Sequence, residues 1–239
     1  MPVKNMVRKV LQTFHLDLTK NLEYDRLTGV ILKRVLQPHS NCVDVGCHKG
    51  EILTEMLQLA PRGKHRAFEP IPQFYNQLKA DFPNVDIYPY ALAASAGKSD
   101  FKFVKNAPAY SGIKERDYAV KNPKIQTLTV DLRRMDEVLT QNTKIDLIKI
   151  DVEGAEMGVL QGAEKIIARN KPIIIFEFGK GASDKYGTEP HMIFELLNGR
   201  HDLKINTLKN FVKDEPALKL ESFEQLYQAN EEYYFIAHS

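Results

Sequence analysis

The sequence is poor in cysteine, in net charge and in long hydrophobic runs, and each shortage excludes a class of protein. Its two cysteines, Cys42 and Cys47, are too few for a four-thiolate metal site, and we interpret them as reduced thiols. Lysines and arginines number 33 against 31 acidic residues and are scattered along the chain, which argues against a nucleic-acid partner. No apolar run approaches the roughly 20 residues that span a bilayer, and the first residues lack the apolar stretch of a signal peptide. We therefore expect a soluble, cytoplasmic protein without a membrane span.

The 239 residues suffice for one α/β domain with a full core, and a second independent domain would be cramped. Residues 5–36 carry apolar side chains at helical spacing with a break around 17–21, which predicts two helices. We expect residues 1–40 to form a helical N-terminal extension and residues 41–239 to form the α/β domain.

Strand-like and helix-like stretches alternate from residue 41 onwards, which implies parallel strands joined by right-handed crossovers. Strands are predicted at 41–45, 64–68, 85–90, 145–151 and 171–178, and helices at 52–60, 72–81, 131–140 and 154–170. Shorter strands are predicted at 100–105 and 125–131 around a polar excursion, followed near the end of the chain by a helix at 190–198 and weaker strands at 203–207 and 233–237. The fold class is a doubly wound, mostly parallel α/β sheet.

The first strand ends in a glycine-bearing loop, Val-Asp-Val-Gly-Cys-His-Lys-Gly over residues 43–50. Glycines permit positive φ and let backbone N–H groups approach a ligand closely. Glu69 stands at the end of the next strand, where open α/β folds bind a ribose through an acidic side chain. Asp44 and Glu69 therefore predict a nucleoside pocket. A dinucleotide fold would need Gly-x-Gly-x-x-Gly, and Cys47 and His48 stand where glycine would be expected.

Four short motifs follow one another along the chain. They read Val-Asp-Val-Gly at 43–46, Phe-Glu-Pro at 68–70, Ile-Asp-Leu-Ile-Lys-Ile-Asp-Val-Glu-Gly-Ala-Glu at 145–156 and Val-Leu-Gln-Gly at 159–162. Together they resemble the FkbM family of methyltransferases over about residues 41–178, with a weaker tail. The resemblance implies a Rossmann-like seven-strand sheet with an antiparallel last hairpin, S-adenosylmethionine as methyl donor, and a hydroxyl acceptor on a sugar, a glycan or a secondary metabolite.

On this resemblance, the loop after the first strand and the ends of the next two strands would hold S-adenosylmethionine. Asp44 would order the loop or receive the ammonium group, and Glu69 would accept both ribose hydroxyl hydrogens. The alternative is a structural turn in which Asp44 caps a helix. The cofactor-binding positions we predict are Asp44, Gly46, Cys47, His48, Gly50, Glu69, Pro70, Tyr90 and Ala91.

Candidate catalytic residues gather where two later strands end. Lys149, Asp151 and Glu153 follow the fourth strand, and Glu177 closes the fifth on the same edge of the sheet. A hydroxyl acceptor has a pKa far above 7, so a carboxylate there can take or direct its proton, and we favour Asp151. The alternative is that Asp151 caps the helix predicted from Gly154. Lys149 is either an active-site cation or a side chain that snorkels to solvent.

The three acidic residues at this edge could also hold a divalent metal through carboxylate oxygens. Their roles need no metal, and the chain lacks a paired Asp-Asn ligand set, so we predict no metal site. Glu156, one turn into the next helix, could stabilise the helix dipole and do nothing more.

Two polar, glycine-bearing segments, 106–121 and 179–188, lie beside carboxyl ends of strands, where loops carry specificity. We predict that they face a small-molecule or glycan acceptor, with Tyr110 and Ser111 as the contacts.

Other functions stay open. A nicotinamide-dependent oxidoreductase shares the plan of strand, loop and acid, although the missing glycine pattern opposes it. A catalytically degenerate fold kept as an interaction module would have lost cofactor residues, and those residues are intact. Methylation of base amines would need an Asn/Asp-Pro-Pro-aromatic turn after the fourth strand, where Asp151-Val152-Glu153-Gly154 stands.

Overall fold

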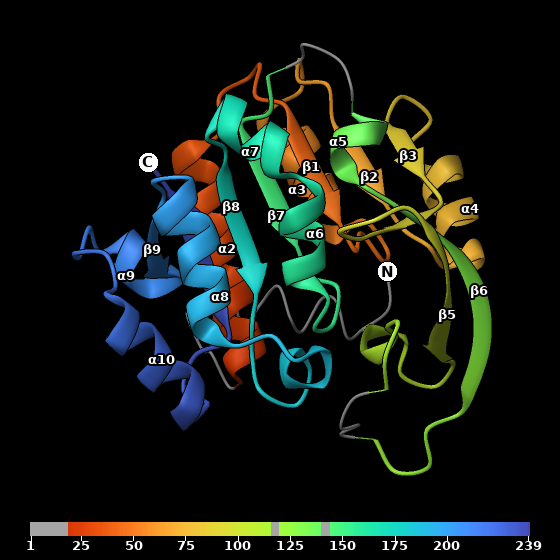
Figure 1. Ribbon diagram of the computed structural model, residues 1–239. Coiled ribbons are helices and arrows are strands. Elements are labelled where there is room, and N and C mark those ends of the chain that lie inside the picture. The colour runs from red at the N-terminus through yellow and green to blue at the C-terminus, as the bar shows by residue number, and fades with distance from the viewer. Residues whose placement is uncertain (1–18, 116–119, 140–143) are drawn as a thin grey trace.

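The computed structural model describes residues 19–115, 120–139 and 144–239 and forms a seven-stranded sheet with helices on both faces, beside a smaller three-stranded sheet (Figure 1). The first of the two predicted N-terminal helices lies outside the described residues. None of the described helices is long and apolar enough to span a membrane.

The large sheet has the strand order β3-β2-β1-β7-β8-β10-β9. Its strands are β1 (Cys42–Val45), β2 (Arg66–Phe68), β3 (Asp86–Tyr88), β7 (Leu147–Ile150), β8 (Ile173–Glu177), β9 (Lys204–Thr207) and β10 (Tyr234–His238). The strands from β3 to β8 pair in parallel, and β10 pairs antiparallel with both β8 and β9. The prediction of a mostly parallel seven-strand sheet with an antiparallel C-terminal strand is confirmed. The strand order reverses between β1 and β7, the place where open α/β sheets bind ligands.

Helices cover both faces of this sheet, because its central strands are apolar on both sides. In Figure 1, α6, α7 and α8 lie in front of the sheet and α2 and α3 lie behind it. Alternate strand residues enter different cores: Val43, Ile148 and Ile174 pack with the front helices, whereas Leu147 and Ile175 pack with α2. The helices are α2 (Lys20–Val35), α3 (Glu51–Leu59), α4 (Pro72–Asp81), α5 (Met135–Val138), α6 (Glu156–Gly162), α7 (Glu164–Asn170), α8 (Pro190–Phe194), α9 (Leu208–Val212) and α10 (Leu220–Ala229).

The helix α2, which begins the described chain, packs on the large sheet. Its residues Tyr24, Leu27 and Ile31 are buried in one cluster with Ile175 and Ile236 from β8 and β10. The N-terminal part of the chain therefore contributes to the core behind β8 and β10. The division into an extension and an α/β domain stays a prediction.

The smaller sheet was not predicted. It has the order β4-β6-β5, formed by β4 (Tyr90–Leu92), β5 (Gly97–Val104) and β6 (Ile125–Arg133). The strand predicted at 85–90 was wrong at its end, because the chain leaves the large sheet after Tyr88 and enters the small one at Tyr90. Phe101, Phe103 and Val130 anchor the β5–β6 hairpin against Ile71 and Phe74 beside the large sheet.

Two helix predictions also differ from the structure, and two helices were missed. The helix predicted at 131–140 is shortened to α5, because residues 131–133 continue β6. The helix predicted at 154–170 is two helices, α6 and α7, which meet at Ala163. Helices α9 and α10 in the tail were not predicted. Short turns of 3-10 helix, η1 (Pro108–Tyr110) and η2 (Ser183–Tyr186), lie in the segments expected to face an acceptor, and a π-helical turn, η3 (Glu195–Arg200), extends α8.

Candidate functional site

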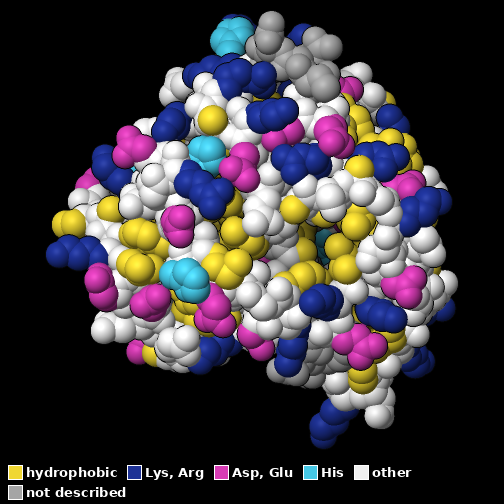
Figure 2. Space-filling view, viewed as in Figure 1, with side chains coloured by type: hydrophobic (Ala, Val, Ile, Leu, Met, Phe, Trp, Pro, Cys, Tyr) yellow, Lys and Arg dark blue, Asp and Glu magenta, His cyan; other side chains and the backbone are white. Residues whose placement is uncertain are grey.

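A pocket lies at the carboxyl ends of β1, β2, β4 and β7, where the reversal of strand order predicts a ligand site. Figure 2 shows a hollow in this face of the molecule with hydrophobic side chains gathered around it. Twelve predicted site residues line the pocket: Asp44, Gly46, Cys47, His48, Glu69, Pro70, Tyr90, Ala91, Ser111, Lys149, Asp151 and Glu153. Three others, Gly50, Tyr110 and Glu177, are not part of its lining.

Gly46 brings the loop after β1 against the end of β7. Its φ is +76°, and a Cβ at this position would lie 1.9 Å from the carbonyl oxygen of Asp151. The N–H of Gly46 donates to the carbonyl of Phe68 at 3.1 Å, and the N–H of Asp151 donates to that of Val45 at 3.1 Å. Since only glycine fits here, the loops that follow β1, β2 and β7 are held together at the floor of the pocket.

Gly50 has a different reason to be glycine. A Cβ there would lie 2.6 Å from the ring of Phe82, and φ is +76° at the start of α3. The residue therefore permits close packing between α3 and the end of α4, and its position offers no direct contact with the pocket.

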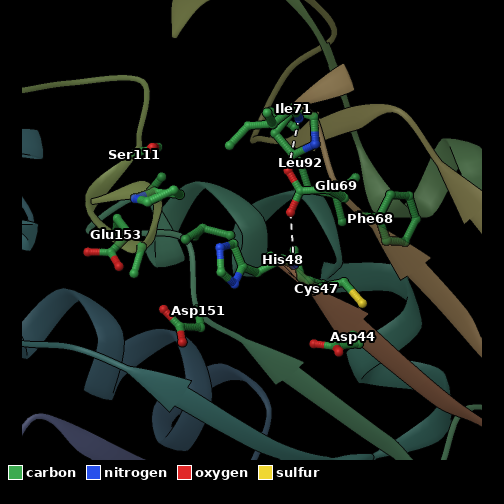
Figure 3. Close-up of a pocket in the computed structure, with 18 of the residues that line it drawn as sticks. Asp44, Cys47, His48, Phe68, Glu69, Ile71, Leu92, Ser111, Asp151 and Glu153 are labelled. Carbon is green, nitrogen blue, oxygen red and sulfur yellow. Dashed lines mark hydrogen bonds between the residues drawn. The ribbon is translucent and has the colours of Figure 1, made fainter. Parts of the chain in front are cut away.

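Glu69 is the most firmly held acid of the pocket. Its Oε2 accepts a hydrogen bond from the N–H of His48 and its Oε1 accepts one from the N–H of Ile71, both at 2.8 Å (Figure 3). The side chain is buried, and burial raises its pKa to about 7 although the two backbone donors oppose the shift. Each carboxylate oxygen keeps a second lone pair, so Glu69 can accept two further hydrogens from a ligand.

Asp44 and Lys149 form a buried pair in the lining of the pocket. The ammonium of Lys149 lies 3.7 Å from Oδ1 of Asp44 and 3.4 Å from Oδ2 of Asp151. Burial raises the pKa of Asp44, and the charge of Lys149 opposes that shift. Burial alone would lower the pKa of Lys149, but Asp151 and Asp44 outweigh it and raise the pKa. Lys149 is thus a buried cation between two carboxylates and does not extend to solvent.

Asp151 lies toward the other end of the pocket from Glu69, with His48 between them in the view of Figure 3. Its Oδ2 accepts a hydrogen bond from the hydroxyl of Tyr234 at 2.5 Å. Burial works to raise the pKa of Asp151, but Lys149, Glu177 and Tyr234 outweigh it and hold the pKa below its ordinary value. Asp151 is therefore ionised at neutral pH. Tyr234 was not among the predicted site residues, because its contact with Asp151 joins residues 83 positions apart.

The proposed helix-capping role of Asp151 does not match the structure. The helix α6 begins at Glu156, and its N-cap position is Ala155, which has no side chain that caps it. The side chain of Glu156 instead accepts hydrogen bonds from the N–H groups of Val152 and Gly154, both at 3.1 Å. Glu156 therefore holds the turn after β7 and leaves Asp151 available to the pocket.

Three carboxylates come close together near this end. One oxygen from each of Asp151, Glu153 and Glu177 lies within 4.8 Å of the others. Such oxygens could bind a divalent cation, but Asp151 already faces the ammonium of Lys149 and the hydroxyl of Tyr234. We assign no metal to the cluster.

Of the two residues predicted to contact the acceptor, Ser111 lines the pocket and Tyr110 does not. The hydroxyl oxygen of Ser111 accepts a hydrogen bond from the N–H of Val104 in β5 at 3.0 Å, which leaves its hydrogen to donate. Tyr110 is not among the lining residues, whereas its neighbours Pro108 and Ala109 are.

The pocket combines apolar walls with polar side-chain atoms that lack a hydrogen-bond partner among the described residues. Ile52, Ile71, Leu92 and Phe101 provide apolar walls. Among the described residues, both carboxylate oxygens of Asp44 and the Nε2 of His48 are buried without a hydrogen-bond partner. Burial, followed by the charge of Lys49, lowers the pKa of His48, so this ring is neutral at pH 7. These unsatisfied polar atoms, together with Glu69, are groups that a polar ligand can pair.

Comparison with known proteins supports a single family. The family model described as the methyltransferase FkbM domain matches residues 44–204. The crystal structure of methyltransferase FkbM from Methylobacillus flagellatus has a TM-score of 0.52 and 15% sequence identity, covering 85% of this chain and 44% of that one. At this identity the likeness shows a shared fold.

Characterised relatives have low identity to the chain. It is 28% identical over 155 residues to the methyltransferase sdnD of Sordaria araneosa, and the match covers 52% of this chain and 60% of that protein. It is 24% identical over 169 residues to the 2-O-methyltransferase NoeI of Sinorhizobium fredii, and the match covers 64% of this chain and 68% of that protein. A third relative, the AMB antimetabolite synthetase AmbE of Pseudomonas aeruginosa, is 27% identical over 179 residues, and the match covers 59% of this chain but 8% of the synthetase. The chain thus spans less than two thirds of the length of sdnD and of AmbE.

Proposed function

Because this chain belongs to the FkbM family of methyltransferases, we propose that it transfers the methyl group of S-adenosylmethionine to a hydroxyl of a sugar, a glycan or a secondary metabolite. The observation that carries the proposal is the placement of Glu69 and Asp151 in one pocket, the first fixed to accept hydroxyl hydrogens and the second ionised. The similarity to a protein named as a 2-O-methyltransferase supports oxygen as the methylated atom.

At the cofactor end, this chain's residues bind and orient. When bound, S-adenosylmethionine supplies an electrophilic methyl carbon on a sulfonium. Glu69 would accept the two ribose hydroxyl hydrogens with its remaining lone pairs, and Asp44 would receive the ammonium group. Tyr90 and Ala91 would lie against the adenine.

At the acceptor end, Asp151 would orient the hydroxyl and take its proton. A low pKa makes Asp151 a weak base toward an intact hydroxyl. The hydroxyl proton would become strongly acidic, however, once its oxygen accepted the methyl group that bound S-adenosylmethionine would supply. A weakly basic carboxylate can then accept the proton, and its fixed position aligns the oxygen for attack.

Thermal melting with added ligands tests the cofactor, and labelled donor tests the reaction. We expect S-adenosylhomocysteine to raise the melting temperature and NAD to leave it unchanged. Incubation with methyl-labelled S-adenosylmethionine and a panel of hydroxylated sugars, glycans and extracts should then label a product. Stabilisation by NAD alone would contradict the proposal and favour an oxidoreductase.

A further inference from the structure

A tyrosine of the last strand contacts the acceptor-end carboxylate from outside the pocket. Tyr234 is the first residue of β10, and its hydroxyl donates to Oδ2 of Asp151 at 2.5 Å. It does not belong to the pocket lining, so it can act on an acceptor only through Asp151. The antiparallel pairing of β10 with β8 places Tyr234 directly opposite Glu177, at the level where Asp151 follows the last residue of β7.

The helix α2 secures this tyrosine. The ring of Tyr24 lies 5.1 Å from the ring of Tyr234 and 4.7 Å from that of Tyr233. The hydroxyl of Tyr24 donates to Glu232 at 2.6 Å and accepts the backbone N–H of Tyr233 at 3.2 Å. Both α2 and β10 lie outside residues 44–204, the region that the family model matches. The segments that flank this region therefore join behind Asp151.

Charged groups reach Asp151 from several elements, and the hydroxyl of Tyr234 is a neutral donor among them. Lys149 approaches from β7, with Asp44 of β1 beyond it, and Glu177 approaches from β8. Glu153 belongs to the same group of carboxylates, and Glu156 is the first residue of α6. The charge of Asp25 on α2 also acts on the tyrosine and helps to raise its pKa. Burial and then Asp151 raise the pKa of Tyr234 well above its ordinary value, so the hydroxyl keeps its proton to donate.

We propose that Tyr234 is a positioning residue for methyl transfer, which fixes the orientation of the Asp151 carboxylate and keeps it ionised, and that α2 holds Tyr234 in place. This role rests on the proposed function. In this proposal, α2 and β10, which lie outside the region matched by the family model, help to form the acceptor end of the pocket. A tyrosine that only filled space would need its ring and not its hydroxyl.

The test is the substitution Tyr234→Phe, with Tyr233→Phe as the matched control. The control removes a hydroxyl from the neighbouring residue, where it donates to Asn21 at 2.5 Å. The pKa of Asp151 is read from the carbon-13 resonance of its carboxyl group, assigned with Asp151→Asn, in the full chain. We expect Tyr234→Phe to raise the pKa of Asp151 by about one to two units, the shift that matches loss of one hydrogen bond to a charged group. Tyr233→Phe should leave it in place.

The same proteins separate this inference from the proposed function. Affinity for S-adenosylhomocysteine, measured by calorimetry, should be unchanged in Tyr234→Phe, whereas the acid limb of the turnover profile should move up in pH with the carboxyl pKa. An unchanged pKa of Asp151 in Tyr234→Phe would overturn the positioning role while leaving methyl transfer standing. If the unmutated chain does not bind S-adenosylhomocysteine, the proposed function fails and the positioning role fails with it.

A second variant keeps the test decisive if Tyr234→Phe does not fold. Replacing Tyr234 with a ring-fluorinated tyrosine retains the aromatic ring and makes its hydroxyl a stronger donor. The pKa of Asp151 should then fall further below its ordinary value. A pKa that stays in place or rises would contradict the proposal.

Discussion

Glu69 and Asp151 are carboxylates of the same pocket, yet their surroundings shift their pKa values in opposite directions. Burial raises the pKa of Glu69 to about 7, and its carboxylate accepts hydrogen bonds from two backbone N–H groups, those of His48 and Ile71. Lys149, Glu177 and Tyr234 hold the pKa of Asp151 below its ordinary value despite burial. A pair of acids whose environments separate their pKa values is typical of a site with divided roles. This difference agrees with the roles that we propose, cofactor binding for Glu69 and proton transfer for Asp151.

A third acid shows that a raised pKa does not by itself identify a functional group. Glu156 is buried, its pKa is also raised to about 7 by burial, and it also accepts two backbone N–H groups. It does not line the pocket. The two glutamates differ in that only Glu69 lines the pocket, and Glu156 is therefore the natural control for experiments on Glu69.

The largest effect is expected at the acceptor end. Asp151→Asn should lower turnover by roughly 10²–10⁴, the range for loss of a general base, while affinity for S-adenosylhomocysteine stays nearly intact. Turnover is measured with the acceptor found by methyl labelling, in the presence and absence of a chelator. Near-normal turnover in Asp151→Asn would refute the assignment, and inhibition of the unmutated protein by chelator would indicate a metal.

At the cofactor end, Glu69→Gln should weaken the binding of S-adenosylhomocysteine by about 1–3 kcal/mol, because an amide cannot accept both ribose hydrogens and leaves polar partners unsatisfied. Glu156→Gln should bind with an affinity close to that of the unmutated protein. Calorimetry on the two folded variants gives the comparison. Equal losses in both would mean that Glu69, like Glu156, only holds its loop.

The raised pKa of Glu156 should make the stability of the protein depend on pH. The folded-state pKa of Glu156 is about 7 against an ordinary 4.5, so its contribution to stability is full below about pH 4.5 and is lost as the pH rises through 7. Glutamine does not titrate. The unfolding free energy of Glu156→Gln relative to the unmutated protein should therefore improve by about 2 kcal/mol between pH 5 and pH 8. Urea unfolding at both pH values measures this, and a constant difference would show that the pKa of Glu156 is not raised.

The smallest effect concerns the pH dependence of cofactor affinity. Below about pH 7 the free protein holds a proton on Glu69, which the ribose hydroxyls must displace, so affinity for S-adenosylhomocysteine should rise about tenfold from pH 6 to pH 8. Glu69→Gln should lose this dependence and Glu156→Gln should keep it. A dependence that survives in Glu69→Gln would have to come from another group.

The sequence predicted those parts of the fold that follow from local pattern. The helix predicted at 72–81 is α4 to the residue, since Pro72 favours its first turn and Phe74 and Leu78 recur at helical spacing. The strand predicted at 85–90 overran because Pro89, which lacks an N–H, separates β3 from β4. That signal was present in the sequence. The three-stranded sheet was not predicted, because β4 pairs with β6, and β5 and the loop after it separate these two strands in the sequence.

In the candidate site, too, the residues identified by local motifs were predicted and the residue that depends on a distant contact was not. Asp44 lies in β1, Gly46 and Glu69 directly follow β1 and β2, and all three line the pocket. Tyr234 could not be predicted, because its contact with Asp151 depends on the register of the last strand against β8. The roles of these residues stay predictions.

The most direct test of divided roles is a crystal structure of the chain with S-adenosylhomocysteine. We predict the ribose hydroxyls at hydrogen-bond distance from both oxygens of Glu69, about 2.6–3.2 Å, and the sulfur on the side of the pocket that Asp151 occupies. A ligand bound with its ribose away from Glu69, or with its sulfur turned from Asp151, would contradict the account.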